Sequence, residues 1–186
     1  VLISKKPIRK LSDLKGLKVR AMSATNIPQI NAWGAAGLAL PITKTYDALD
    51  KGVIDSVHVA VNALYRPWRF AEIAKHATDG LEGPTSLFGL LMNKKVWDGL
   101  PAADKGKIDG LTGSQFGIET AHSWAQSDVK AIAKAKKGVG GVKYHMLSKS
   151  EAAPFDAVTA KATEKFLADQ EKNGVPARAI YAAITK

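Results

Sequence analysis

The sequence contains no cysteine. Disulfides, thiolate catalysis and cysteine-ligated metals are therefore excluded. Long hydrophobic runs are also missing, since no stretch approaches the roughly 18 consecutive apolar residues of a membrane-spanning helix. The chain starts at Val1 rather than at Met, and its first residues lack the basic and apolar regions of a signal peptide. We therefore expect that processing or truncation removed the start of the gene product.

Acidic residues are scarce relative to basic ones. Lys and Arg number 27 and Asp and Glu number 17, which gives a net charge of +10. This excess favours anionic partners: organic acids, nucleic acids or acidic membrane surfaces. The chain has 186 residues, of which 46% are hydrophobic. It is therefore long and apolar enough to fold into one domain or parts of two, and disorder is excluded as its main state.

The first 60 residues alternate between strand and helix patterns. Such alternation predicts βαβ units and a buried parallel sheet, hence an α/β fold. The expected strands lie at 17–20, 38–42 and 53–60, and the expected helices lie at 28–36 and 43–52.

The rest of the chain begins with an apolar run and then becomes mainly helical. Residues 85–92 predict a strand, and the helical period of 104–137 is weakened by Gly110, Gly113 and Gly117, where we expect a bend. A short strand is expected at 142–146. Ser148 and Glu151 match a capping box at the start of a further helix, and a last helix is expected at 176–184.

No motif for catalysis, cofactor binding or metal binding is present. The segment Gly113–Gly117 lacks the spacing of a nucleophile elbow, and the glycines at 138–141 follow a helix rather than a strand. The four histidines are not at ligand spacing. We therefore expect no cofactor and no metal. The lobe of a small α/β enzyme nevertheless stays an alternative, and the lysines between Lys130 and Lys137 leave a basic nucleic-acid-binding module as another.

Arg20 ends one of the expected strands. Ligands of open α/β sheets bind beyond the carboxyl ends of the strands. A guanidinium there can hold a carboxylate through two parallel hydrogen bonds. On the residue pattern alone, a surface ion pair is the alternative.

Several segments in order along the chain resemble the solute-binding proteins of tripartite ATP-independent periplasmic (TRAP) transporters. The first is the segment LSDLKGLKVR, residues 11–20. It is followed by YDAL and GVID at 46–55, by EIAKH at 72–76, and by MNK and WDGLP between 92 and 101. Each segment alone is weakly specific, whereas their order and spacing together are fairly specific.

The resemblance implies a fold of two α/β lobes that close over a small organic acid. Residues 1–82 and 121–186 would then belong to the second lobe, and 83–120 would belong to the C-terminal part of the first. The N-terminal part of the first lobe would be missing, so that the chain is a fragment. Residues 85–92 would lack partner strands, and the exposed edge would favour homo-oligomers.

The resemblance also implies the ligand site. Arg20 matches the family's strand-end arginine, which pairs with the ligand carboxylate, and Ile42, His58 and Val59 align with neighbouring contact segments. Ile42 and Val59 are aliphatic where some relatives have an aromatic and an amide. This difference indicates a less polar pocket than one for a sugar acid or a small dicarboxylate.

Three further residues are candidates for lining the same pocket. Met22 follows Arg20 by two positions and so points the same way along the strand. Asn62 lies shortly after Val59, and Trp68 lies in the segment YRPWRF, which is too polar for a simple core strand. The expected protein is therefore a periplasmic binding protein rather than an enzyme. It would deliver an organic acid to TRAP membrane subunits and would not bind nucleic acid.

Overall fold

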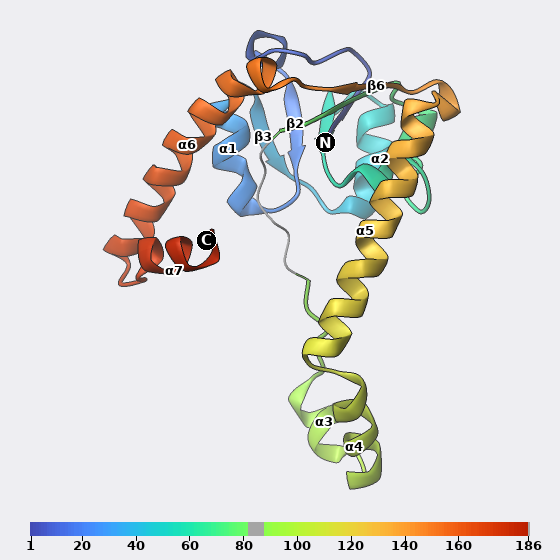
Figure 1. Cartoon of the computed structure of the whole chain (residues 1–186), viewed down its shortest axis with the longest axis vertical. Coiled ribbons are helices and arrows are strands. Elements are labelled where there is room, and N and C mark those ends of the chain that lie inside the picture. Colours follow the sequence, from blue (N-terminus) through green and yellow to red (C-terminus); the bar gives the residue numbers. More distant parts are fainter. Residues whose placement is uncertain (82–87, 186) are drawn as a thin grey trace.

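The computed structural model describes residues 1–81 and 88–185 and shows a mixed α/β fold with helices on both faces of one sheet (Figure 1). The sheet has six strands in the order β3-β2-β4-β1-β5-β6. Their bounds are β1 Leu2–Ser4, β2 Lys18–Ala21, β3 Ala36–Ala39, β4 Ser56–His58, β5 His76–Asp79 and β6 Lys143–Met146.

The sheet is mixed, where the sequence pattern predicted a parallel one. Strand β2 is parallel to both β3 and β4, and β5 is parallel to β6. Strand β1 lies antiparallel between β4 and β5. The prediction was wrong for β1 because the βαβ pattern constrains only β2, β3 and β4. Two short 3-10 helices, η3 (Val61–Leu64) and η4 (Phe70–Glu72), connect β4 to β5 without an α-helical crossover.

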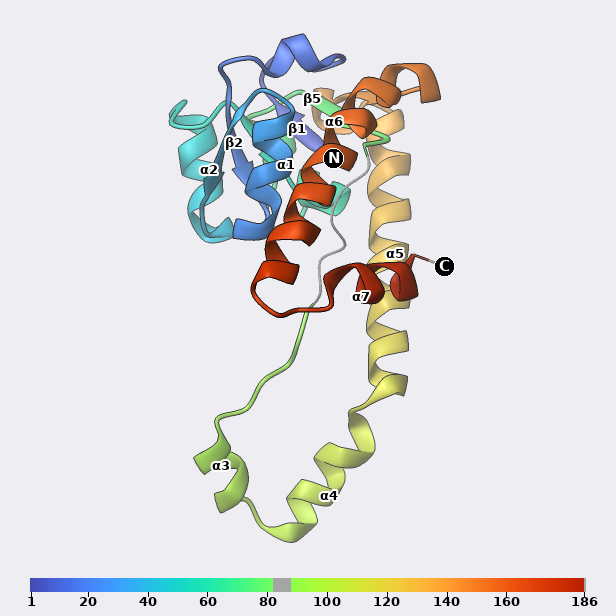
Figure 2. The same cartoon turned by 90° about the vertical axis from the view of Figure 1, so that its left-hand side faces the viewer.

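Two layers of helices cover the sheet. Helices α1 and α6 pack on one face, and α2 and α5 pack on the other (Figures 1 and 2). The helix bounds are α1 Ile27–Ala32, α2 Ile42–Asp50, α3 Lys94–Gly99, α4 Ala102–Leu111, α5 Ser114–Lys136, α6 Lys149–Lys172 and α7 Ala177–Ile184.

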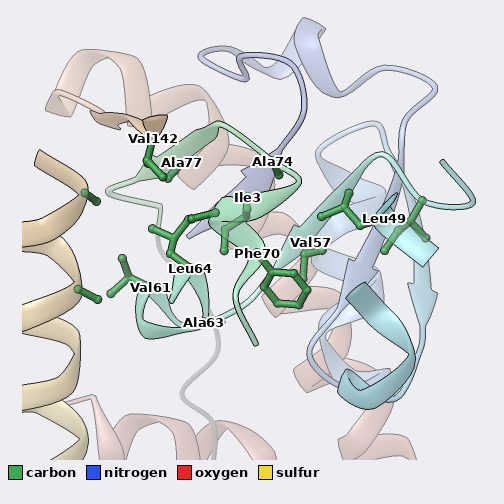
Figure 3. Close-up of a cluster of buried hydrophobic side chains, with 14 residues drawn as sticks. Ile3, Leu49, Val57, Val61, Ala63, Leu64, Phe70, Ala74, Ala77 and Val142 are labelled. Atoms are coloured by element: carbon green, nitrogen blue, oxygen red, sulfur yellow. The ribbon is translucent and has the colours of Figure 1, made fainter. Parts of the chain in front are cut away.

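Each face of the sheet has its own apolar core. On the α1 and α6 side, Trp33 packs edge-on against Phe155, with ring centroids 5.9 Å apart. On the other side, Val57 of β4, Leu49 of α2 and Phe70 belong to one buried cluster (Figure 3). Successive strand residues therefore alternate between the two cores, as the period of a strand requires.

The boundaries around β3 differ from those predicted. Helix α1 ends at Ala32 rather than at 36, and Gly34 follows it at φ 90°. The predicted buried strand at 38–42 is instead the largely exposed edge strand β3, Ala36–Ala39. Helix α2 already begins at Ile42, because Pro41 stands before it without an N–H and its carbonyl accepts a hydrogen bond from Thr45 Oγ1 at 3.0 Å.

Two other strands differ from the predictions, and two later elements agree with them. Strand β4 is shorter than the predicted 53–60, since the amides of Val53 and Ile54 donate to the Ala48 carbonyl of α2 at 2.8 and 3.2 Å rather than to a neighbouring strand. Strand β5 was not predicted at all, because its four residues include His76 and Asp79 and carry no long apolar pattern. Strand β6 and helix α7 confirm the strand predicted at 142–146 and the helix predicted at 176–184.

The segment after β5 does not form the strand predicted at 85–92. Residues 85–87 lie outside the described residues, and residues 88–92 are not in a strand. Phe88, Leu90 and Leu91 are 74%, 82% and 93% exposed. Within residues 1–81 and 88–185, no strand pairs with this segment, so its backbone has no ladder to join.

The predicted bend in the long helical pattern is confirmed. Gly113, at φ 86°, separates α4 from α5. Helices α3 and α4 and the first part of α5 extend away from the sheet (Figures 1 and 2). Among the described helices, none combines the length and apolar character that a membrane crossing needs.

The capping box of α6 is formed as predicted and gives a first test. Ser148 Oγ accepts from the Glu151 amide at 3.3 Å, and Glu151 Oε2 accepts from the Ser148 amide at 2.8 Å. We expect Ser148→Ala to lower the free energy of unfolding by about 1 kcal/mol, measured by urea denaturation. The control Ser123→Ala, at an exposed position inside α5, should leave it unchanged or slightly raised. Equal losses in the two variants would contradict the cap.

Candidate functional site

The carboxyl ends of β2, β3 and β4 meet at one edge of the sheet because these strands are parallel. Arg20 is the next-to-last residue of β2. Leu40 directly follows β3, and His58 is the last residue of β4. This edge is where open α/β sheets bind their ligands.

Arg20 is buried at this edge, with 6% of its surface exposed. Its Nε donates to the Leu40 carbonyl at 3.0 Å, and its Nη1 donates to the His58 carbonyl at 3.4 Å. The guanidinium is therefore held by the ends of both neighbouring strands. Neutral carbonyls orient the cation but do not cancel its charge.

No Asp or Glu of the described residues forms an ion pair with Arg20. Burial lowers the pKa of the guanidinium, but an arginine keeps its proton in proteins. A buried cation without a counter-ion is costly. The alternative of a surface ion pair is therefore excluded for the described part of the chain.

His58 lies beside Arg20 in the sheet, but its ring points to the opposite core. The residue is 3% exposed, and its ring lies edge-on to Trp33 at 5.4 Å. Burial, the N-terminal ammonium and Arg20 lower the pKa of His58 to about 3. His58 is therefore neutral near pH 7, and it contributes its backbone carbonyl to the Arg20 site rather than its ring.

Asn26 is a buried residue of this edge that the sequence reasoning missed. Its Oδ1 accepts from the Met22 amide at 3.3 Å and lies 2.9 Å from His58 Nδ1, while its Nδ2 donates to Gln29 Oε1 at 2.8 Å. Because an amide oxygen only accepts, His58 must carry its proton on Nδ1. The only sequence signal was the run SATN directly before Ile27 and Pro28, which is typical of a helix start.

The apolar candidates pack against the core that Val57 belongs to. Ile42, Val59 and Trp68 are all partly buried against this cluster, as is Leu40. Met22 is also partly buried. Met22, Leu40 and Val59 directly follow β2, β3 and β4, so apolar residues come at the carboxyl ends of all three strands.

Asn62 is in η3, and its backbone N–H donates to Asp128 Oδ1 of α5 at 3.2 Å. Among the described residues, no hydrogen bond or ion pair joins Arg20 to Asn62 or to Trp68. Arg20 is thus hydrogen-bonded to His58, and His58 is linked to Met22 through Asn26. Asn62 and Trp68 lie outside this network. The same described residues contain no group of three His, Asp or Glu side chains placed to hold a metal ion.

A family model described as bacterial extracellular solute-binding protein, family 7, matches residues 2–170. The chain belongs to this family. A curated relative is the C4-dicarboxylate-binding periplasmic protein DctP of Rhodobacter capsulatus, 26% identical over 159 residues. The match covers 85% of this chain and 46% of the relative. These findings confirm the resemblance, and the matched proteins are binding and transport proteins rather than enzymes.

Solved structures of TRAP solute-binding proteins have the same fold. One from Desulfovibrio salexigens, with bound orotic acid, is 28% identical with a TM-score of 0.75, and the match covers 98% of this chain and 58% of that one. Another, from a marine metagenome and specific for aromatic acid ligands, has a TM-score of 0.82 at 23% identity. That match covers 96% of this chain and 56% of the other.

This chain spans about half the length of the curated relatives that it matches, 46% of one and 50% of another. The relatives therefore contain a further segment of similar size.

The low pKa of His58 predicts how stability depends on pH. A histidine in an unfolded chain has a pKa of about 6.5, and that of folded His58 is about 3. Between these values the unfolded state binds more protons, so acidification lowers the free energy of unfolding. We expect the stability of wild type relative to His58→Gln to fall by up to about 1.4 kcal/mol per pH unit below pH 6.

Urea denaturation at several pH values between 7.5 and 5 checks this expectation. The control is His122→Gln, which removes an exposed histidine of α5. Its stability should track that of wild type at every pH. A difference between wild type and His58→Gln that does not change with pH would contradict a buried, neutral His58.

Proposed function

We propose that this protein binds an organic acid at the carboxyl edge of β2, β3 and β4, with Arg20 receiving the ligand carboxylate. The observation that carries the proposal is the buried Arg20 cation, which is oriented by two carbonyls and lacks a carboxylate among the described residues. A ligand carboxylate would supply the missing charge and accept charge-assisted hydrogen bonds.

The surroundings of Arg20 favour a ligand with one carboxylate and an apolar body. Ile42, Val59 and Met22 offer aliphatic surface near the edge, and Trp68 offers an aromatic ring farther along the chain. His58 is neutral and buried, so it cannot act as a second cation for a dicarboxylate. Related structures bind orotic acid and aromatic acids, which are carboxylates with flat bodies.

The family supports a role in transport. We infer that the protein works in the periplasm and passes its ligand to TRAP membrane subunits, as a part of a two-lobed receptor. In that architecture the second lobe contains 1–82 and 121–186, and 83–120 crosses to the first lobe. Closure of two lobes would trap the ligand in proportion to its preference for the closed state. The lobe boundaries and self-association stay predictions, and no observation favours an enzyme or a nucleic-acid-binding module.

Thermal shifts with a panel of acids test this proposal. The panel contains an aromatic monocarboxylate, a C4-dicarboxylate and a sugar acid. A ligand at about 100 times its Kd adds roughly 2.7 kcal/mol of stability. We expect the aromatic acid to raise the Tm of wild type most, Arg20→Gln to abolish the shift, and Arg20→Lys to keep only part of it, because an ammonium lacks the planar fork.

The matched control is Arg9→Gln, which removes one exposed arginine of the segment between β1 and β2. Its shift should equal that of wild type. An undiminished shift in Arg20→Gln would refute the role of Arg20. If no acid shifts this chain but one shifts the full-length gene product, binding requires residues outside this chain.

A further inference from the structure

A concave surface lies between α5 and the segment that contains η3 and η4. Figure 3 shows Val61, Ala63 and Leu64 of η3 beside this helix. The cavity has a volume of about 590 Å³ and is lined by η3, η4, α5 and the turn at Val139–Gly140. Of the residues predicted from the sequence for the ligand site, only Asn62 lines it. It is therefore separate from Arg20.

The lining of this cavity is strongly basic, and we call it the basic groove. Five cations line it: Arg66, Arg69, Lys75, Lys130 and Lys134. The one carboxylate in the lining is Glu72, which pairs with Arg69 at 3.1 Å and accepts from Tyr46 Oη at 3.0 Å. Four cations are thus left without a carboxylate in the described part of the chain.

The positions of two of these cations are fixed by neutral groups. Lys75 Nζ donates to the carbonyls of Ala71 at 2.7 Å and of Gly140 at 2.9 Å. Lys134 Nζ lies over the Tyr65 ring, 5.4 Å from its centroid. Such contacts hold the two charges on different walls without neutralising them. Lys130 and Arg66 are exposed.

We propose that the basic groove docks a carboxylate-rich segment of a partner protein. The cations come from three separate segments, so they suit an extended polyanion with several charges better than one small ion. A concave surface cannot lie flat on a lipid headgroup layer. Single-stranded nucleic acid binding relies on open aromatic faces for base stacking, but Lys134 covers the face of Tyr65. Half-exposed Val139 at the rim adds the apolar contact that a peptide can use.

Fluorescence anisotropy with a labelled octaglutamate peptide tests the proposal, and a labelled thymidine octanucleotide serves as the rival polyanion. The test variant is Arg66→Glu with Lys130→Glu, since neither side chain makes a hydrogen bond or ion pair within the described residues. The control is Lys149→Glu with Lys161→Glu, which makes the same charge change on exposed positions of α6. Circular dichroism and thermal melting confirm that each variant folds.

We expect wild type to bind the peptide more tightly than the oligonucleotide. The groove variant should bind the peptide about tenfold more weakly, and the control pair should change affinity by about twofold or less at physiological salt. The milder Arg66→Gln with Lys130→Gln should give an intermediate loss. The thermal shift with an organic acid should stay unchanged in the groove variant, which separates this test from that of Arg20.

Three results would overturn the proposal. One is failure of wild type to bind the peptide. The second is an equal loss in the groove variant and the control pair, which would assign binding to overall charge. The third is tighter binding of the oligonucleotide, lost in the groove variant, which would make the groove a nucleic-acid site.

Discussion

The parallel pairing of β2 with both β3 and β4 is the constraint on which the candidate site depends. It brings the carbonyl after β3 and the carbonyl at the end of β4 to either side of Arg20. Two hydrogen bonds that Arg20 donates to these carbonyls fix the guanidinium at a buried position. A surface arginine would adapt to many anions, whereas a fixed one is preorganised for a carboxylate in one orientation, which reduces the ordering cost of binding.

The charged Arg20 and the neutral His58 lie on opposite faces of the sheet. Arg20 points into the same face as Val57, its partner in the register, and His58 points to the other. His58 packs against Trp33 and bonds Asn26, and its low pKa keeps it neutral. A second buried cation would raise the cost of burying Arg20. A neutral His58 therefore adds no further positive charge beside Arg20.

The sequence predicted those elements that are determined by hydrophobic periodicity, by a glycine or by a local capping motif. The strand that contains Arg20, the break at Gly113 and the capping box of α6 were all predicted, although β2 runs one residue past Arg20, to Ala21. It did not predict the boundaries around Pro41, where local proline chemistry decided between strand and helix, nor β5, which is defined by its neighbours rather than by apolar residues. The role of His58 could not be predicted from the sequence. The face of the sheet on which its ring lies depends on strand register, and register is fixed only when the strands pair.

The arm from Phe88 to the start of α5 differs physically from the rest of the molecule. Helices α3 and α4 contain no buried residue among those described, and Phe88 stacks on Trp124 at 4.8 Å while both stay exposed. Helices without tertiary burial are marginal on their own. In contrast, α5 becomes buried at Ala131 and Ala135, where it meets the sheet core. The assignment of 83–120 to another lobe stays a prediction, and a contact with such a lobe would bury the apolar side chains that the described part of this arm exposes.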